Sequence, residues 1–265
     1  MKIGSLELEP IIDGHGFEPL DEVVARDDGL GWDCPLHPVD ASGNLRMDHG
    51  GFLLRGPSDR VVLIDAGLGR SSNDRRAGGA LPENLLRRGV RPEDVTDVVF
   101  THLHFDHVGW ATQQGEVYFS NATYRVHQDD WSHFVTGETA QPGAQKKLAP
   151  LEKQLETFTS EFEIAPGLIA RPAPGHTPGS TVYLVADGAE RAMLLGDVVH
   201  GVAELTEPEW HGLYDLDPRA ARSMRDALAS EAAAMGDVVA AAHFPDLKLG
   251  RLVLAPDGRR QFAFV

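Results

Sequence analysis

A short apolar segment that ends in a cluster of metal-binding side chains constrains this chain more than any other feature. Residues Val98–Phe100 are β-branched or aromatic and predict a buried strand, and three histidines and one aspartate follow within six positions. Side chains two positions apart in an extended chain point the same way, so His102 and His104 can face one point. Asp106 and His107 follow where the chain must turn and can face a second point nearby. The segment therefore predicts part of a site for two metal ions.

Three more candidate ligands lie beside other apolar segments. They are a histidine in a tight turn, then an aspartate and a histidine that each follow an apolar run: His176 in Pro174–Gly179, Asp197 after Ala192–Leu195 and His243 after Val238–Ala242. Side chains at strand ends can converge on one rim of a sheet core. Imidazole and carboxylate together favour zinc, iron, manganese or cobalt over calcium or magnesium.

The order of these motifs, HxHxDH, then GHTPG, then GD, then a final histidine, resembles the metallo-β-lactamase superfamily of metallohydrolases. The resemblance spans roughly Gly51 to His243. It implies an αββα sandwich, two mixed sheets back to back with helices outside, formed by residues 1–265 as a single domain. It also implies that one metal is held by His102, His104 and His176, that the other is held by Asp106, His107 and His243, and that Asp197 bridges the two. Unrelated surface histidines and capping aspartates are the alternative explanation.

Composition narrows the function classes. The chain has 40 Asp and Glu against 24 Lys and Arg, a formal charge of −16, which argues against nucleic acid and anionic membranes as partners. Cys34 is the only cysteine, so no internal disulfide is expected. Residues Met1–Glu9 alternate apolar and polar side chains, which predicts a strand rather than a signal peptide, and no segment approaches the length of a membrane span. We expect a cytoplasmic protein with a small-molecule substrate, and a homodimer is left open.

Residues 13–49 are rich in glycine, proline and aspartate without a sustained period, which predicts a long loop or arm near the active site. It contains four side chains that could overlie the metals, His15, Trp32, His37 and His49. A surface loop with solvated histidines is the alternative for each.

Asp65 ends the second of two predicted strands, Gly51–Arg55 and Arg60–Asp65. The superfamily commonly has an aspartate here, which implies a group that orients a ligand histidine, and a turn cap is the alternative.

Further elements follow from local signals. Asp217 and Pro218 predict the start of a helix that ends at Gly236, and a terminal hairpin is expected around Pro256–Gly258. Residues 131–150 predict a loop or short insertion, with Trp131 and Phe134 as candidate pocket walls and ordinary core packing as the alternative for each. Residues 148–158 predict a helix.

The chemistry implied by two metals is hydrolysis without a covalent enzyme intermediate. Two divalent ions, zinc before iron, manganese or cobalt, would share a water and lower its pKa, so that a bridging hydroxide is the nucleophile at neutral pH. Asp106 could orient the hydroxide and pass a proton to the leaving group. The predicted enzyme is therefore a binuclear metal-dependent hydrolase.

The downstream segment, residues 176–243, looks most like the branch that contains lactone and organophosphate hydrolases. A tyrosine commonly lies three residues after the bridging aspartate in the lactone hydrolases, and here that position is His200. We expect an ester or lactone substrate, with a phosphotriester as a further option. His200 could donate a hydrogen bond to the oxyanion or carry a proton, and a structural histidine bonded to a carbonyl is the alternative. His211 and Tyr214 lie in a loop that could reach the pocket.

Three other functions stay open. A β-lactamase would usually be exported, and a signal peptide is not expected here. A thioester hydrolase of the glutathione type would carry an additional helical domain, which this sequence does not indicate. A non-enzymatic metal-binding or sensing protein could use the same scaffold.

Overall fold

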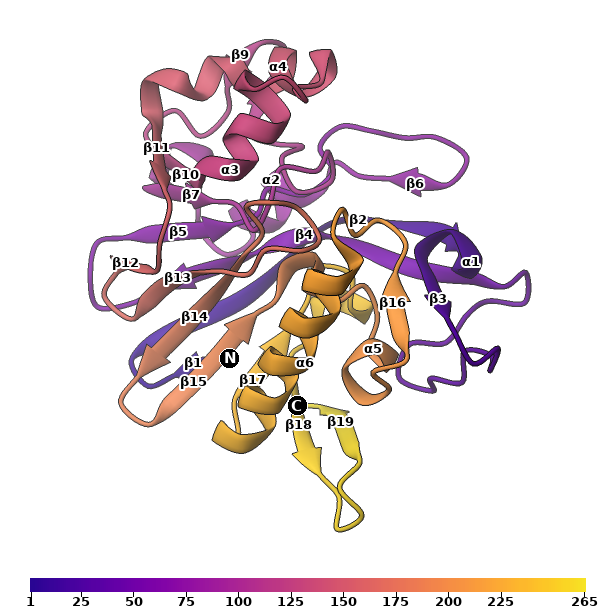
Figure 1. Cartoon of the computed structure of the whole chain (residues 1–265). Helices are drawn as coiled ribbons and strands as arrows, with labels where there is room; N and C mark the ends of the chain where they lie inside the picture. The colour runs from indigo at the N-terminus through magenta and orange to yellow at the C-terminus, as the bar shows by residue number, and fades with distance from the viewer.

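The computed structural model describes residues 1–265 and shows two β-sheets packed face to face, with helices on both outer faces (Figure 1). The first sheet consists, in spatial order, of β1 (Lys2–Ile3), β2 (Leu6–Pro19), β4 (Asn44–Arg55), β5 (Val61–Ile64), β7 (Asp97–Val99), β10 (Thr123–His127) and β11 (Leu155–Phe158), with β6 (Arg76–Ala77) paired to β2. The second consists of β12 (Phe162–Ala165), β13 (Leu168–Pro172), β14 (Thr181–Asp187), β15 (Glu190–Leu194), β17 (Val238–Ala240), β18 (Gly250–Leu254) and β19 (Arg260–Phe264).

Both sheets are mixed. In the first, β5, β7, β10 and β11 run parallel to one another, while β1, β2, β4 and β5 pair antiparallel in succession. In the second, only β15 and β17 pair in parallel. Two short sheets, β3 (Val24–Arg26) with β16 (Trp210–Gly212) and β8 (Thr112–Gln113) with β9 (Glu116–Val117), lie outside them.

The alternation of side chains along the strands divides the interior into three layers. Leu63 faces a cluster that includes Leu81 and Leu85 of helix α2 (Leu81–Leu86), whereas its neighbour Ile64 faces the second sheet. The other face of the second sheet packs on Leu228 and neighbouring residues of α6 (Pro218–Met235). The predicted αββα sandwich is therefore confirmed. Because one apolar cluster joins the two sheets, we propose that residues 1–265 form a single domain.

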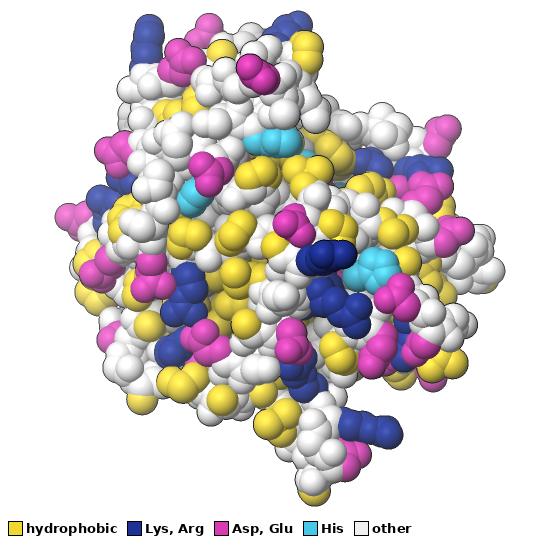
Figure 2. Space-filling view, in the orientation of Figure 1, with side chains coloured by type: hydrophobic (Ala, Val, Ile, Leu, Met, Phe, Trp, Pro, Cys, Tyr) yellow, Lys and Arg dark blue, Asp and Glu magenta, His cyan; other side chains and the backbone are white.

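The remaining helices are short. They are α1 (Leu20–Val23), α3 (Gln128–Trp131), α4 (Pro142–Leu148) and α5 (Ala203–Thr206), with a π-helical turn at Ser132–Thr136 and 3-10 turns at Pro92–Asp94, Ala149–Gln154, Gly196–Val198 and Pro245–Leu247. No helix is long and apolar enough to span a lipid bilayer. On the face drawn in Figure 2, basic side chains lie scattered among acidic ones.

Two expected segments differ from the structure. Residues 13–49 are not one long loop, because β2 continues to Pro19 and β4 begins at Asn44. Two of the glycines that suggested a loop, Gly14 and Gly16, belong to β2. A Cβ on Gly14 would lie 1.9 Å from the carbonyl oxygen of Ala77, so the close approach of β6 requires glycine there. Only residues 27–43, between β3 and β4, are largely irregular.

The segment after β10 also differs from expectation. Residues 131–150 are mostly helical rather than a loop, and the predicted helix over 148–158 is a 3-10 turn followed by strand β11. Helix α6 matches its prediction, because the Asp217 carboxylate accepts hydrogen bonds from the amides of Arg219 and Ala220 and Gly236 ends it with a φ of 69°.

Candidate metal centre

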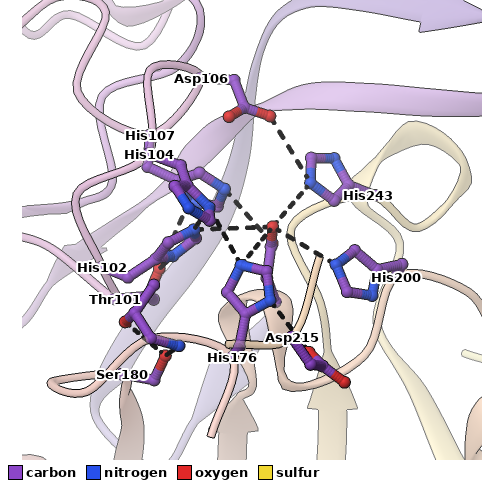
Figure 3. Close-up of polar contacts among 12 residues, drawn as sticks. Thr101, His102, His104, Asp106, His107, His176, Ser180, His200, Asp215 and His243 are labelled. Carbon is purple, nitrogen blue, oxygen red and sulfur yellow. Dashed lines mark hydrogen bonds and ion pairs between the residues drawn. The ribbon is translucent and has the colours of Figure 1, made fainter. Parts of the chain in front are cut away.

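The seven predicted ligands meet at one end of the two sheets (Figure 3). They come from the connections that follow four strands: His102, His104, Asp106 and His107 after β7, His176 between β13 and β14, Asp197 after β15 and His243 after β17. The backbone permits this convergence through close approaches. Gly196 has a φ of 54°, and a Cβ there would lie 2.7 Å from Cβ of Thr101, so only glycine brings Asp197 this near the β7 loop.

Three histidines and one aspartate form the first group of candidate ligands. Nδ1 of His104 lies 2.9 Å from Nε2 of His102 and 3.0 Å from Nε2 of His176. Oδ2 of Asp197 lies 3.7 and 3.6 Å from those two Nε2 atoms. Ligand atoms on one tetrahedral zinc are about 3.4 Å apart, given bonds of about 2.1 Å. The group therefore has the spacing of a cation site.

A second group shares Asp197 with the first. Oδ1 of Asp197 lies 3.3 Å from Nε2 of His107, and Oδ2 lies 3.2 Å from Nε2 of His243. Oδ2 of Asp106 lies 3.7 Å from the same His243 nitrogen. The one carboxylate of Asp197 thus faces both groups, as the sequence resemblance implied for a bridging ligand.

The chemistry of these atoms fits divalent cations. Nε2 of His107 and Oδ1 of Asp197 are buried and have no hydrogen-bond partner, although they are only 3.3 Å apart. Buried polar atoms are normally paired, so two that converge without a hydrogen bond indicate a shared cation. Nitrogen and carboxylate donors together suit zinc and its neighbours in the first transition row.

The two groups differ in their proton affinity. Burial, together with the charge of His107, holds the pKa of His102 well below its usual value, and burial with the charge of His176 lowers the pKa of His104 to about 4. Burial would also lower the pKa of His107, but the carboxylates of Asp197 and Asp65 outweigh it and raise that pKa well above the usual value. His102 and His104 are therefore neutral and ready to bind a cation at neutral pH, while His107 carries a proton that a cation must displace.

Polar partners behind the ligands fix their rings. Oδ2 of Asp65 lies 2.9 Å from Nδ1 of His107, so the sequence-based role for Asp65 agrees with its position. Asp65 holds a φ of 61°, which is uncommon for any residue but glycine. Oδ1 of Asp215 lies 3.1 Å from Nδ1 of His176, and the carbonyl oxygen of Asp48 lies 2.9 Å from Nδ1 of His243. Such partners set which ring nitrogen faces the metal.

Several supporting residues were not identified from the sequence. The buried carboxylate of Asp130 accepts hydrogen bonds from the amides of Leu103 (3.0 Å) and Gly179 (2.7 Å), which joins the two histidine-bearing loops. Asp13 accepts bonds from the amide of Gly69 and the indole nitrogen of Trp110. These partners are distant in sequence, so the only available signal was an acidic residue next to an apolar segment.

Five of the seven predicted ligands line the floor of a cavity of about 260 Å³: His104, Asp106, His176, Asp197 and His243. Its walls include Val23, Met47 and Tyr214, and Phe105, of which 55% is exposed, stands at its edge. The guanidinium of Arg76 lies 5.0 Å from the centre of the Phe105 ring. The cavity therefore combines apolar walls with a polar floor, as small-molecule sites do.

The other predicted pocket residues divide into two groups. His200 and Tyr214 line the cavity, whereas His211 does not. Trp131 and Phe134 are buried in the core between the first sheet and its helices, and Phe134 makes an edge contact with the His104 ring, 5.4 Å between ring centres. Phe134 also lines an adjoining cavity together with His104 and Phe105.

His200 is fully buried beside the two cation positions. Nε2 of His200 lies 3.9 Å from Oδ2 of Asp197, and neither ring nitrogen has a hydrogen-bond partner. Burial lowers its pKa, but the nearby carboxylates of Glu204 and Asp197 outweigh burial and raise the pKa of His200 to about 9. The alternative of a histidine bonded to a backbone carbonyl is wrong, because no such bond is present.

An αββα sandwich with two such ligand groups at one end defines a metalloprotein of a recognisable class. The family model described as Metallo-beta-lactamase superfamily matches residues 51–243, and the chain belongs to this superfamily. A relative from Xenopus laevis, Metallo-beta-lactamase domain-containing protein 1, is 30% identical over 217 residues, which cover 79% of this chain and 77% of the relative.

An N-acyl homoserine lactonase from a Bacillus species is 27% identical over 153 residues. That match covers 51% of this chain, and the chain spans only 57% of the lactonase. Two solved structures are similar over the whole chain. AidC, described as a dizinc quorum-quenching lactonase, has a TM-score of 0.82 and 23% identity and is covered to 95%. A probable metal-dependent hydrolase from Staphylococcus aureus has a TM-score of 0.84 and 20% identity and is covered to 99%. At these identities the structures support the fold alone.

Proposed function

We propose that this chain is a hydrolase of lactones or carboxylic esters of small molecules that uses two divalent cations, with zinc as the favoured metal. The observation that carries the proposal is the sharing of Asp197 by two ligand groups at the floor of one cavity. The description of AidC as a dizinc lactonase and the Bacillus relatives support the choice of substrate. The cytoplasmic location and a homodimer remain predictions.

The chemistry that two such cations supply is a hydroxide nucleophile at neutral pH and polarisation of the substrate carbonyl. We assign the cations to the predicted ligands, one to His102, His104 and His176 and the other to Asp106, His107 and His243, with Asp197 shared. No serine or cysteine nucleophile is required.

Asp106 and His200 are the proposed catalytic residues. Asp106 faces the cavity with a carboxylate that can receive a proton and pass it to the leaving group. His200 faces the same cavity with unpaired ring nitrogens, so it can donate a hydrogen bond to the oxygen on which negative charge develops. Replacing His200 with Phe should lower kcat by about 10²- to 10³-fold, the effect of removing one oxyanion donor. An unchanged kcat would exclude this role.

A substrate panel tests the proposal. The zinc-loaded protein is assayed with acyl homoserine lactones, simple lactones, p-nitrophenyl esters, paraoxon, nitrocefin and a glutathione thioester. We expect hydrolysis of a lactone or ester that chelation abolishes and zinc restores. His102→Ala and Asp197→Ala should lose turnover and bound metal together. Faster turnover of paraoxon, nitrocefin or the thioester would change the substrate class, and a fully loaded protein inactive on every compound would support a binding or sensing role.

A further inference from the structure

An eighth side chain with metal-binding chemistry faces the floor of the cavity. His49 lies in β4, opposite Gly14 of β2, next to a register shift between these strands. Only 4% of its surface is exposed, and it lines the same cavity as the predicted ligands. Its ring meets the ring of His243 edge to face, with 5.2 Å between the ring centres.

The contacts of His49 are of the kind that a metal ligand makes. Its Nδ1 lies 3.1 Å from Oδ2 of Asp106, yet neither Nδ1 nor Nε2 has a hydrogen-bond partner. A buried imidazole with two unpaired nitrogens loses its hydrogen bonds to water without replacing them, which is unfavourable. Asp106 therefore lies close to His49 without forming a hydrogen bond with it.

The same arrangement occurs at a pair already assigned to a cation. Nε2 of His107 and Oδ1 of Asp197 are 3.3 Å apart, buried and not hydrogen-bonded. The separations of 3.1 and 3.3 Å both lie near the spacing of about 3.4 Å between ligand atoms on one tetrahedral zinc. One ligand atom each from His49, Asp106 and His243 also lie within 4.8 Å of one another, and His243 belongs as well to the group that it forms with His107 and Asp197.

We propose that His49 is an additional ligand of the second cation, through Nδ1, beside Asp106, His107, Asp197 and His243. This inference rests on the two-cation site of the proposed function. It gives the second position three imidazoles rather than two, so that position selects zinc or cobalt more strongly over magnesium and calcium.

Cobalt titration of the metal-free protein tests the ligand role without any substrate. The wild type should bind two equivalents, and the visible spectrum of cobalt reports the ligands of each. His49→Ala should bind the second equivalent at least about tenfold more weakly, since loss of even an outer-shell partner commonly costs 10- to 100-fold. The spectrum of that second equivalent should change as well, while the first equivalent is unaffected.

Two further variants keep the outcome clear. His49→Asn retains a side-chain N–H near Asp106 but not the imidazole, so it should behave like His49→Ala if His49 binds the cation. His15→Ala removes an exposed histidine from β2 and should bind both equivalents as the wild type does. Two results would overturn the ligand role of His49 alone. One is wild-type affinity for the second cobalt equivalent in His49→Asn, and the other is an unaltered visible spectrum of that equivalent in His49→Ala. A wild type that binds fewer than two equivalents would overturn the two-cation function and this inference with it.

Discussion

The carboxylate of Asp65 connects the strained end of β5 to the second cation position, because its Oδ2 lies 2.9 Å from Nδ1 of His107. The same side chain accepts hydrogen bonds from the amide and hydroxyl of Thr101, both at 2.8 Å. It therefore fixes the His107 ring so that Nε2 faces the cation, and it raises the basicity of that ring.

Replacing Asp65 with Asn should lower the affinity for the second cation by about 10- to 100-fold, because the amide keeps the shape of the side chain but loses its charge. Competition with a coloured chelator measures the change. Asp187→Asn is the matched control, since Asp187 bonds Ser5 on the exposed surface away from the site. Equal affinities in Asp65→Asn and the wild type would mean that Asp65 is only a turn cap.

Cation binding should depend on pH differently at the two positions. Burial opposes protonation of His107 and His243, but nearby carboxylates, above all Asp197, raise the pKa of both. His107, whose pKa lies well above its usual value, therefore binds a proton in the metal-free protein at neutral pH, and His243 holds a proton more readily than a free imidazole does. The second position should therefore release protons as it binds metal, and its affinity should fall as the pH falls. The loss is about tenfold per pH unit for each proton displaced.

The first position should resist acid, because His104 has a pKa of about 4 and the pKa of His102 is also lowered. Cobalt titrations between about pH 5 and 8 give the pH dependence of the affinity at each cation position. Calorimetry in buffers of different ionisation enthalpy gives the number of protons released at each. Parallel loss of both cations on acidification would contradict the assigned protonation states.

A buried arginine links the two residues that stand behind the site. Arg225 is 3% exposed and lies 3.2 Å from both Glu204 and Asp215. It also donates to the backbone carbonyls of Val198 and Trp210. Arg225 therefore supports Asp215, the partner of His176, and also Glu204, which accepts a hydrogen bond from the amide of His200 at 2.6 Å.

Replacing Arg225 with Met should lower the free energy of unfolding by about 3–5 kcal/mol, because two buried carboxylates lose their counter-charge. Urea denaturation of the metal-free protein gives this value directly. Arg87→Met, in an exposed ion pair with Glu83 on α2, should change it far less. Similar effects of the two substitutions would show that the Arg225 pairs contribute little to folding.

Sequence patterns predicted the parts of this molecule that depend on local chemistry. The strand expected at Val98–Phe100 is β7 at Asp97–Val99, and the helix capped by Asp217 ends at Gly236 as expected. The ligand motifs also converge, since strand ends deliver them to one rim. These features need only periodicity, capping and motif spacing.

Contacts between distant segments could not be predicted in the same way. His49 is in the structure a strand residue beside Asp106, but in the sequence it is one of several histidines in a glycine-rich segment. Asp130 bonds Leu103, 27 positions away, and Asp215 bonds His176, 39 positions away, so the sequence next to each aspartate carries no sign of its role. Gly14 suggested a loop for a related reason. The structure requires a glycine there because β6 approaches β2 closely, and this long-range contact cannot be predicted from the local sequence.

Removing the cations should destabilise the fold. Each cation binds only the native arrangement, in which loops from both sheets meet, so each stabilises the folded state by about 2.7 kcal/mol at a free concentration 100 times its Kd. Chelation should therefore lower the thermal midpoint of the wild type, and zinc should restore it. Asp197→Ala removes the ligand common to both positions, so its midpoint should respond far less to chelator or zinc than that of the wild type. Calorimetric scans of both proteins, with and without chelator, measure this. A direct effect of the substitution on packing shifts the thermal midpoint equally with and without chelator, whereas the loss of cation binding removes the difference between the two scans.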